Sequence, residues 1–286
     1  MKLYYFDGKS REHQIGNFGD DLNPWLWDRL LPDVLDRNDD TLFVGIGTLL
    51  NERLHRRFPN AFKVVFGSGV GYGESPIVDS SWKIYFVRGL LSAKALEIDS
   101  TFALTDPAIL VRNFYTPSEQ KTFSWSYMPH YHEAIFNGAI WQEICESLGI
   151  RYISPTAPIE QILSDIDRSE VLLTEAMHGA IVADAIRVPW VAVKTKKDIL
   201  DFKWHDWLST VSLSYSPFTI QRFASRPGKE GVLRYCDYQL IRMQMAYLKQ
   251  AAKPQLSSVS KQNELTEKVM LKLEQFKLDR VNQACV

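Results

Sequence analysis

The stretch that most limits the fold of this chain runs from residue 171 to residue 193, VLLTEAMHGAIVADAIRVPWVAV. It opens with an apolar run as short as a buried parallel strand and then turns through small and polar residues. Apolar residues at helical spacing follow over 180–186, and a second apolar run fills 188–193. Such a strand–turn–helix–strand unit joins neighbouring parallel strands, so we expect an α/β fold.

The turn of this unit is the first place to look for a site. Ligands of open α/β sheets bind at the carboxyl ends of the strands, where Glu175 and His178 should lie at a helix N-terminus. The alternative is a buried histidine that caps its helix. The small residues Ala176 and Gly179 leave room for a ligand, which favours a functional site.

The segment EAMHGAIVADAIRVPW resembles the polysaccharide pyruvyltransferases, especially those of bacterial exopolysaccharide pathways. The resemblance implies two Rossmann-like domains facing a cleft, in a glycosyltransferase-B-like arrangement. It implies transfer of a pyruvyl group from phosphoenolpyruvate to a sugar as a ketal, with no cofactor. The family turn carries Arg-Leu-His, whose histidine is the general acid. That role carries over to His178, whereas Ala176 stands in place of the arginine and leaves open what supplies its charge.

Length and composition fit a two-domain protein without a nucleic-acid partner. The chain has 286 residues, 45% of them apolar and 23% charged, with a net charge of −1. We expect domains over residues 1–115 and 123–252, a linker near 113–123, and a final amphipathic helix over 264–282. The three cysteines are far apart, and no leader or membrane span is evident, which predicts a cytoplasmic protein. Association with the inner face of the membrane, a lipid-linked acceptor and a homo-oligomer stay open.

Polar and glycine-rich turns follow three expected strands of the first domain, at residues 2–6, 41–46 and 62–66. The first turn holds Asn17 and Asp20 before a helix over 26–31, with Pro24 in the first turn of that helix. The alternative is a helix cap made by Asp20 or Asn23. The third turn is the glycine-rich loop of residues 67–73, which is not a dinucleotide fingerprint.

These turns predict one edge of a substrate site, because glycine lets a backbone approach a ligand closely. The substrate-binding residues expected there are Asn17, Asp20, Gly67, Ser68 and Gly69. The resemblance supports the first two, because the family carries a similar Asn-x-Gly-Asp facing the cleft.

A fourth strand, residues 82–87, ends at Arg88, which can hold an anion in a bidentate fork. A surface salt bridge is the alternative. The family has Arg-Asp and a nearby serine here, which Arg88 and Ser92 match in part. The family's Gly-Asp-Pro segment corresponds to Asp106 with Thr105 before it, and we interpret Asp106 as a strand-end residue near the cleft.

In the second domain, His130 and His132 follow the expected strand 124–128, and a helix is expected over 141–148. A metal site would need further ligands, and none is evident, so we predict no metal and a cleft role for these histidines. Lys203 belongs to Lys-Trp-x-Asp-Trp, which suits an anion or a stacked sugar. The alternative is that its indoles simply pack.

The C-terminal region contributes a connector and a helix. Residues 253–263 resemble a flexible connector in composition. The helix over 264–282 should pack across the domains, back onto the first one, with a partner or a membrane surface as the alternative.

The predicted chemistry protonates the enol ether of phosphoenolpyruvate at carbon. Histidine has an ordinary pKa near ~6.5 and suits this step. Glu175 or the bound phosphate could keep His178 protonated, while Arg88, glycine amides and Lys203 could hold the donor. The runner-up function is a nucleotide-sugar glycosyltransferase or epimerase on the same scaffold, and the third is a non-catalytic scaffold in a polysaccharide assembly complex.

Overall fold

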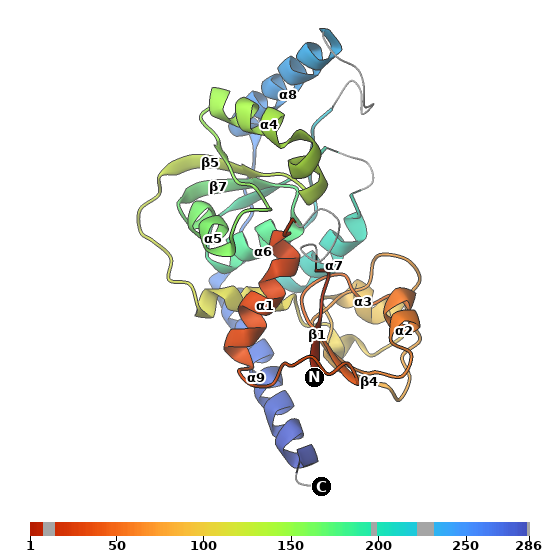
Figure 1. The fold of residues 1–286 in the computed structure, drawn as a ribbon. Helices are drawn as coiled ribbons and strands as arrows, with labels where there is room; N and C mark the ends of the chain where they lie inside the picture. Colours follow the sequence, from red (N-terminus) through yellow and green to blue (C-terminus); the bar gives the residue numbers. More distant parts are fainter. Residues whose placement is uncertain (8–14, 196–198, 222–231, 285–286) are drawn as a thin grey trace.

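The chain folds into two parallel β-sheets that follow one another along the sequence (Figure 1). A computed structural model describes residues 1–7, 15–195, 199–221 and 232–284. The strand order is β1-β2-β3-β4 in the first sheet and β6-β5-β7-β8-β9 in the second. Neighbouring strands pair in parallel in both sheets. The expected α/β class is confirmed, and both sheets are consistent with Rossmann-like folds.

In the first half, helices separate the first three strands, and a loop without a helix joins the third strand to the fourth. Its strands are β1 (Lys2–Tyr4), β2 (Thr41–Val44), β3 (Phe62–Phe66) and β4 (Trp82–Phe86). Its helices are α1 (Phe18–Leu30), α2 (Glu52–Arg57), α3 (Leu90–Ala95) and the 3-10 helices η1 (Ser100–Phe102) and η2 (Pro107–Asn113).

The second half alternates strands with helices and reverses its strand order once. Its strands are β5 (Phe123–Met128), β6 (Arg151–Tyr152), β7 (Ser169–Thr174), β8 (Trp190–Lys194) and β9 (Phe218–Thr219). Its helices are α4 (Tyr131–Ser147), α5 (Ile159–Asp167), α6 (Met177–Ala185), α7 (Asp201–Val211), α8 (Val232–Ala251) and α9 (Val259–Ala284). The chain runs from β5 out to β6 and returns to β7 on the other side of β5. Ligands of doubly wound sheets bind at such a switch point, here beyond the ends of β5 and β7.

Helix α1 begins at Phe18, well before the expected residue 26, so Pro24 lies inside the helix and not in its first turn. A proline has no N–H to donate to the carbonyl of Asp20 one turn earlier. The side-chain amide of Asn23 donates to that carbonyl instead, at 3.2 Å. The expected polar loop is therefore the start of the helix.

Helix α4 begins at Tyr131, so the helix expected over 141–148 corresponds only to its last part. Its first turn holds the buried carboxylate of Glu133. That carboxylate accepts hydrogen bonds from Asn137 Nδ2 at 3.0 Å and Trp141 Nε1 at 3.1 Å. A buried acid that is bonded to its own helix interrupts the apolar periodicity, which is why the sequence pattern did not reveal these turns.

One hydrophobic cluster joins the two sheets. It includes Leu22 of α1, Phe43 of β2 and Ile109 of η2 from the first half, and Ile181 of α6 and Trp190 of β8 from the second. Both α1 and η2 pack against α6. The chain passes from one sheet to the other between η2 and β5, near the expected linker, but the division into domains stays a prediction.

Helix α9 returns to the first half, where it lies along the first sheet (Figure 1). The ring of Phe276 is buried against Phe43, Phe66 and Tyr85, with centroids 5.5–6.1 Å apart. The Tyr85 hydroxyl donates to Asp279 at 2.7 Å. The expected packing of this helix across both halves is confirmed.

The segment before α9 is tied down, so the expectation of a flexible connector over 253–263 is wrong. The backbone of Gln255 exchanges two hydrogen bonds with Trp190 of β8. The buried carboxylate of Asp184 in α6 accepts from Ser257 N at 2.8 Å and from the Gln262 amide. Buried polar groups of this kind fix a segment because they would be costly to leave unpaired.

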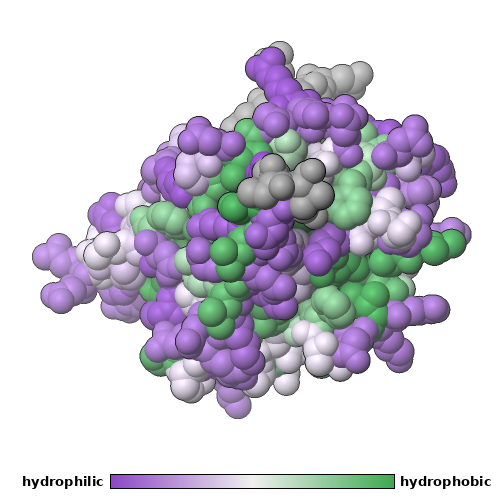
Figure 2. All heavy atoms as spheres, turned by 90° about the horizontal axis from the view of Figure 1, so that it is seen from below, coloured by the Kyte–Doolittle hydropathy of each residue, from purple (hydrophilic) through white to green (hydrophobic). Residues whose placement is uncertain are grey.

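The outer face of α9 keeps some apolar side chains in solvent, namely Leu271, Leu278 and Val281. Figure 2 views the molecule from below, where α9 ends in Figure 1, and shows apolar residues among hydrophilic ones on that face. In the described part of the chain, no helix has the length and apolar character needed to cross a membrane.

Truncation of Phe276 tests the return of α9. Phe276→Ala should lower the free energy of unfolding by about 3–4 kcal/mol, because it empties a buried aromatic cluster. Leu278→Ala, on the exposed face of the same helix, should change it by less than about 0.5 kcal/mol. Urea unfolding of both variants gives the comparison, and equal effects would show that α9 does not rely on this contact.

Candidate active site

His178 lies at the switch point, in the first turn of α6 directly beyond β7. The residue at the cap position of α6 is Ala176, and no side chain caps the helix. The alternative that His178 caps its own helix is therefore wrong. The side chain of His178 is 15% exposed.

The imidazole of His178 is held between the two halves. Its Nε2 is buried and lies 3.5 Å from Oδ2 of the fully buried Asp106. On the Nδ1 side the ring lies against Gly19 of α1, so closely that a Cβ at that position would overlap it. The absence of a side chain at Gly19 is therefore a condition for this position of the ring.

The sequence suggested that Asp106 lies at a strand end, and this is wrong. It is the N-cap of η2, and its Oδ1 accepts from Ala108 N at 3.0 Å. The expected nearness to the site is correct, because η2 packs against α6. Asp106 contacts His178 from the start of a 3-10 helix, which no apolar periodicity in the sequence predicts.

The first turn of α1 places Asn17 and Asp20 beside His178. Asn17 is the N-cap residue, yet its side chain donates to Asp20 Oδ2 at 2.5 Å instead of capping the helix. Asn23 lies further into the helix, where Oδ1 accepts from Ile46 N at 2.8 Å. The alternative that Asp20 or Asn23 caps the helix is therefore wrong.

Burial raises the pKa of Asp20 to about 6, although nearby His178 and the hydrogen bond from Asn17 oppose the shift. Burial also lowers the pKa of Lys203 in α7 to about 8, with repulsion from Arg88 adding to the effect and Asp20 opposing it. The ammonium of Lys203 has no hydrogen-bond or ion-pair partner among the residues that the structure describes. It is therefore a cation available to an anionic ligand.

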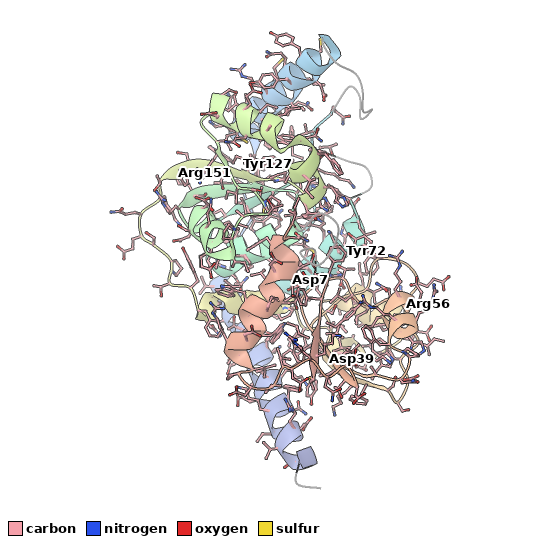
Figure 3. The ribbon with its side chains drawn as sticks, in the orientation of Figure 1. Asp7, Asp39, Arg56, Tyr72, Tyr127 and Arg151 are labelled. Atoms are coloured by element: carbon pink, nitrogen blue, oxygen red, sulfur yellow. The ribbon has the colours of Figure 1, made fainter. Side chains whose placement is uncertain are left out.

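Two tyrosines complete the surroundings of Asp20. Partial burial raises the pKa values of both Tyr72 and Tyr131, and the charge of Asp20 raises them further, although Arg88 opposes the shift of Tyr72. Tyr72 lies near α7 in Figure 3. Neither was expected from the sequence, because a single tyrosine in a loop or at the start of a helix carries no pattern.

Arg88 is fully buried and is engaged by protein groups. Nε donates to Asp206 of α7 at 3.0 Å, one terminal nitrogen to Thr48 Oγ1 at 2.9 Å, and the other to the Val70 carbonyl at 3.0 Å. Ser92 is buried beside it and donates its hydroxyl to Asp206 at 2.6 Å. The alternative of a surface salt bridge is therefore wrong, since the pair is internal.

Contact of Arg88 or Ser92 with a substrate stays a prediction, and it would require these bonds to open. Sequence reasoning missed Asp206 as the partner of Arg88. The motif Trp-x-Asp-Trp could have indicated such a pair, because an acid between two buried indoles is itself buried and needs a polar or charged partner. Its indoles, Trp204 and Trp207, pack with Trp190, so the alternative that they simply pack is confirmed.

The loop of residues 67–69 packs around the same arginine. Gly67 has φ +91°, and a Cβ there would overlap Pro107 and the Phe86 ring. A Cβ at Gly69 would overlap the Arg88 guanidinium. The Ser68 hydroxyl donates to the Gly47 carbonyl at 3.1 Å. The groups that approach these glycines closely are protein groups, and ligand binding by the loop stays a prediction.

Glu175 is buried and braces the ends of three strands. It accepts from Thr195 N at 2.6 Å, from His130 N at 3.1 Å and from the hydroxyl of Tyr127, which is labelled on β5 in Figure 3. Burial raises its pKa. Both carboxylate oxygens are thus engaged away from His178, and the carboxylates found beside that histidine are Asp106 and Asp20, not Glu175.

His130 and His132 lie at the start of α4, beyond β5. His130 is the N-cap residue, and its Nδ1 accepts from His132 N at 3.4 Å. His132 is exposed, and the two ring centroids are 5.3 Å apart. Their predicted substrate role is untested. Within the described residues no three His, Cys, Asp or Glu side chains are grouped as a metal site.

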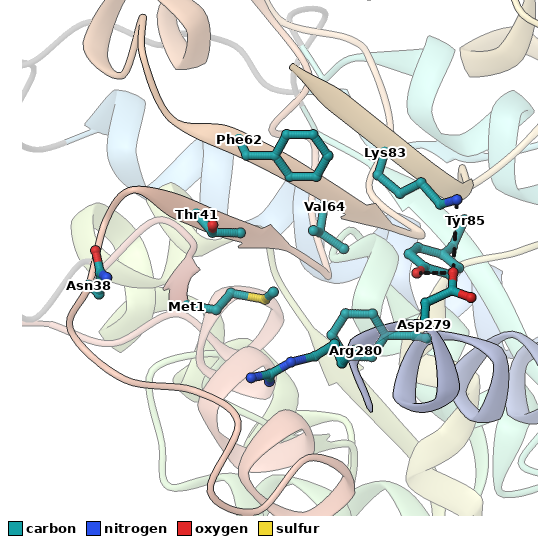
Figure 4. Close-up of a pocket in the computed structure, with 10 residues that line it drawn as sticks. Met1, Asn38, Thr41, Phe62, Val64, Lys83, Tyr85, Asp279 and Arg280 are labelled. Atoms are coloured by element: carbon teal, nitrogen blue, oxygen red, sulfur yellow. Dashed lines mark hydrogen bonds and ion pairs between the residues drawn. The ribbon is translucent and has the colours of Figure 1, made fainter. Parts of the chain in front are cut away.

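A separate cavity of about 250 Å³ lies at the other end of the first sheet (Figure 4). Phe62, Tyr85 and Phe276 line it, with Lys83 and Arg280 also on its wall. It lies near the amino ends of β2, β3 and β4, whereas Arg88 and its partners lie at the carboxyl ends. It is therefore distinct from the His178 site.

A comparison with known families decides between the functions that this geometry allows. The family model for polysaccharide pyruvyl transferase matches residues 5–197. The chain belongs to the polysaccharide pyruvyl transferase family. The pyruvyltransferase is also 43% identical over 223 residues to the succinoglycan biosynthesis protein ExoV of Rhizobium meliloti (strain 1021). That similarity covers 76% of this chain and 67% of ExoV.

The resemblance predicted from the segment around His178 is thereby confirmed, and the protein is a transferase enzyme. This favours pyruvyl transfer over the glycosyltransferase, epimerase and scaffold alternatives. The family match includes Asp20, Asp106 and His178 and ends before Lys203. Lys203 therefore lies in a part of the chain that the family model does not reach.

Asp20→Asn tests the electrostatics of the site. The folded protein holds the pKa of Asp20 at about 6, against an ordinary value of 3.8. Between these values the folded state binds more protons than the unfolded state, so Asp20 costs stability as pH rises from about 4 to about 6. At about pH 7.5 the variant should be more stable than the wild type by up to about 2–3 kcal/mol.

Urea unfolding across this pH range measures the effect. At about pH 4 the folded carboxyl is protonated and the unfolded one is about half ionised, so the difference there is small and reports mainly the altered bond with Asn17. A difference between the two proteins that stays constant from about pH 4 to about pH 7.5 would contradict the assignment.

Proposed function

We propose that this pyruvyltransferase transfers the pyruvyl group of phosphoenolpyruvate to two hydroxyls of one sugar residue in exopolysaccharide biosynthesis, forming a ketal. The family supports pyruvyl transfer, and the similarity to ExoV, a succinoglycan biosynthesis protein, supports a polysaccharide acceptor. We further propose that the two Rossmann-like halves face each other as in glycosyltransferases of the B type. The position of His178, between β7 of one half and Gly19 of the other, supports this.

The observation that carries the proposal is the imidazole of His178, held at the switch point near Asp20, whose charge also acts on Lys203. As general acid, the imidazolium gives a proton to the methylene carbon of the donor and leaves an oxocarbenium-like centre at the next carbon. One sugar hydroxyl adds to that carbon, and a second displaces phosphate with cleavage of the carbon–oxygen bond. Of the two hydroxyl protons released, one restores the imidazolium and the other leaves with phosphate.

The donor carries a phosphate and a carboxylate, which need positive partners. Lys203 is the cation best suited to this role, because its ammonium has no partner among the described residues. We infer that Lys203 supplies the charge that the family arginine would bring at Ala176. The first turn of α6, which has no side-chain cap, adds the favourable end of the helix dipole.

The direct test is incubation of the protein with phosphoenolpyruvate and a panel of free and lipid-linked sugar acceptors. We expect phosphate release that depends on the acceptor, together with a product heavier by one carboxyethylidene group. Release of phosphate from no acceptor in the panel, or the same release without any acceptor, would count against the proposal.

His178→Gln tests the general acid. Glutamine keeps a polar amide of similar size but cannot transfer a proton in this range of pH, so kcat should fall by about 10²–10⁴ while the protein stays folded. His55→Gln, on the exposed face of α2, is the matched control and should keep full activity. Near-normal turnover in His178→Gln would show that His178 is not the general acid.

Lys203→Met tests the donor site. Loss of a charged partner should raise the KM for phosphoenolpyruvate about 10- to 100-fold, as expected for an ionic hydrogen bond worth about 1.5–3 kcal/mol. The exposed Lys94→Met removes the same charge elsewhere and should leave KM unchanged. Because the pKa of Lys203 is lowered to about 8, wild-type binding should weaken as pH rises through that value.

Amine labelling provides a second measurement at about pH 8. A lysine with a lowered pKa reacts faster than surface lysines, and phosphoenolpyruvate should protect Lys203 from the reagent. If phosphoenolpyruvate does not change the labelling rate of Lys203, the donor binds elsewhere.

A further inference from the structure

Asp106 has one carboxylate oxygen that its structural role does not use. Oδ1 caps η2 by accepting from Ala108 N at 3.0 Å. Oδ2 is buried and accepts no hydrogen bond from any described residue. A cap needs only one oxygen, so serine or asparagine would serve η2 equally well. A buried carboxylate oxygen without a donor is costly, which points to a use for the second oxygen.

The only described ionic partner of that oxygen is the imidazole of His178. Nε2 of His178 is also buried, accepts or donates no hydrogen bond in the described part of the chain, and lies 3.5 Å from Asp106 Oδ2. Two orphaned buried atoms therefore face each other across the contact between η2 and α6. A proton on Nε2 would satisfy both of them at once.

We propose that Asp106 is a positioning residue that keeps a proton on Nε2 of His178, so that Nδ1 is the nitrogen that delivers the catalytic proton. The proposal rests on the proposed function for its catalytic part. In the acid form both nitrogens carry protons. Transfer from Nδ1 to the donor's methylene carbon leaves a neutral ring that still holds its Nε2 proton toward Asp106.

Gly19 supplies the other half of this arrangement. It lies on the Nδ1 side of the ring, where a Cβ would overlap that nitrogen. Nε2, by contrast, is buried without a hydrogen-bond partner in the described part of the chain. The two nitrogens thus have different surroundings: Nε2 is enclosed with a carboxylate, whereas Nδ1 lies against Gly19 of α1, the helix whose first turn also holds Asp20. That asymmetry is what a fixed tautomer requires.

Asp106→Asn changes this contact with little change of shape. Asparagine Oδ1 can still cap η2, but its amide nitrogen then faces Nε2 as a donor. Nε2 must accept, so the neutral ring should switch its proton to Nδ1. Nitrogen-15 NMR of the imidazole, assigned with His178→Gln, distinguishes the two tautomers without any substrate. We expect the Nε2–H tautomer in the wild type and the Nδ1–H tautomer in Asp106→Asn.

The kinetic expectation follows from the wrong tautomer. Asp106→Asn should lower kcat about 10- to 1,000-fold, with the KM for phosphoenolpyruvate within about threefold of wild type. Asp99→Asn is the matched control, because Asp99 caps η1 through Thr101 N at 2.8 Å in the same way. It should leave both the tautomer of His178 and kcat unchanged.

The outcomes separate this proposal from the proposed function. An Nδ1–H tautomer in the wild type, or an unchanged tautomer in a folded Asp106→Asn, overturns the role of Asp106 whatever the substrate is. The wild-type spectrum decides even where the variant does not fold. The expected tautomers without pyruvyl transfer would uphold the positioning role and reject phosphoenolpyruvate as the donor.

Discussion

The buried ion pair between Arg88 and Asp206 is the interaction on which the site depends. A buried ion pair is tolerated only when both charged groups have all their hydrogen-bond partners. Besides its bond to Asp206, Arg88 donates to backbone carbonyls and a hydroxyl in the loops after β2 and β3. The pair fixes α7, which belongs to the second half, against the strand ends of the first. Lys203 lies one helical turn before Asp206, so the same pair also determines where this lysine lies.

The histidine is positioned by a different set of contacts. His178 is brought to the site by the β7–α6 turn, but its ring is bounded by Gly19 of α1 and Asp106 of η2. Neither half of the chain holds the ring alone. The hydrophobic cluster that joins α1, η2 and α6 is therefore as much a part of the active site as the polar side chains are.

The sequence predicted most of the strands, because a buried parallel strand is a continuous apolar run, and β3 agrees residue for residue. The two-residue β9 was not expected. It also predicted which turns carry polar residues. It could not predict their partners, since Glu175 faces β5 and β8 and Arg88 faces Asp206 only through tertiary packing. Helix α1 was misjudged because Asn23 offsets the missing N–H of Pro24, a compensation that propensity does not express.

Helix α9 has a consequence for how substrates reach the site. It is anchored on α6 through Gln262 and Asp184 at one end and on the first sheet through Phe276 and Asp279 at the other. Its 26 residues span about 39 Å, so it acts as a rigid strut between the halves. A strut of this kind opposes a wide hinge motion. We expect exchange of donor and acceptor to depend on local movements of loops near His178, with the two sheets keeping a nearly constant separation.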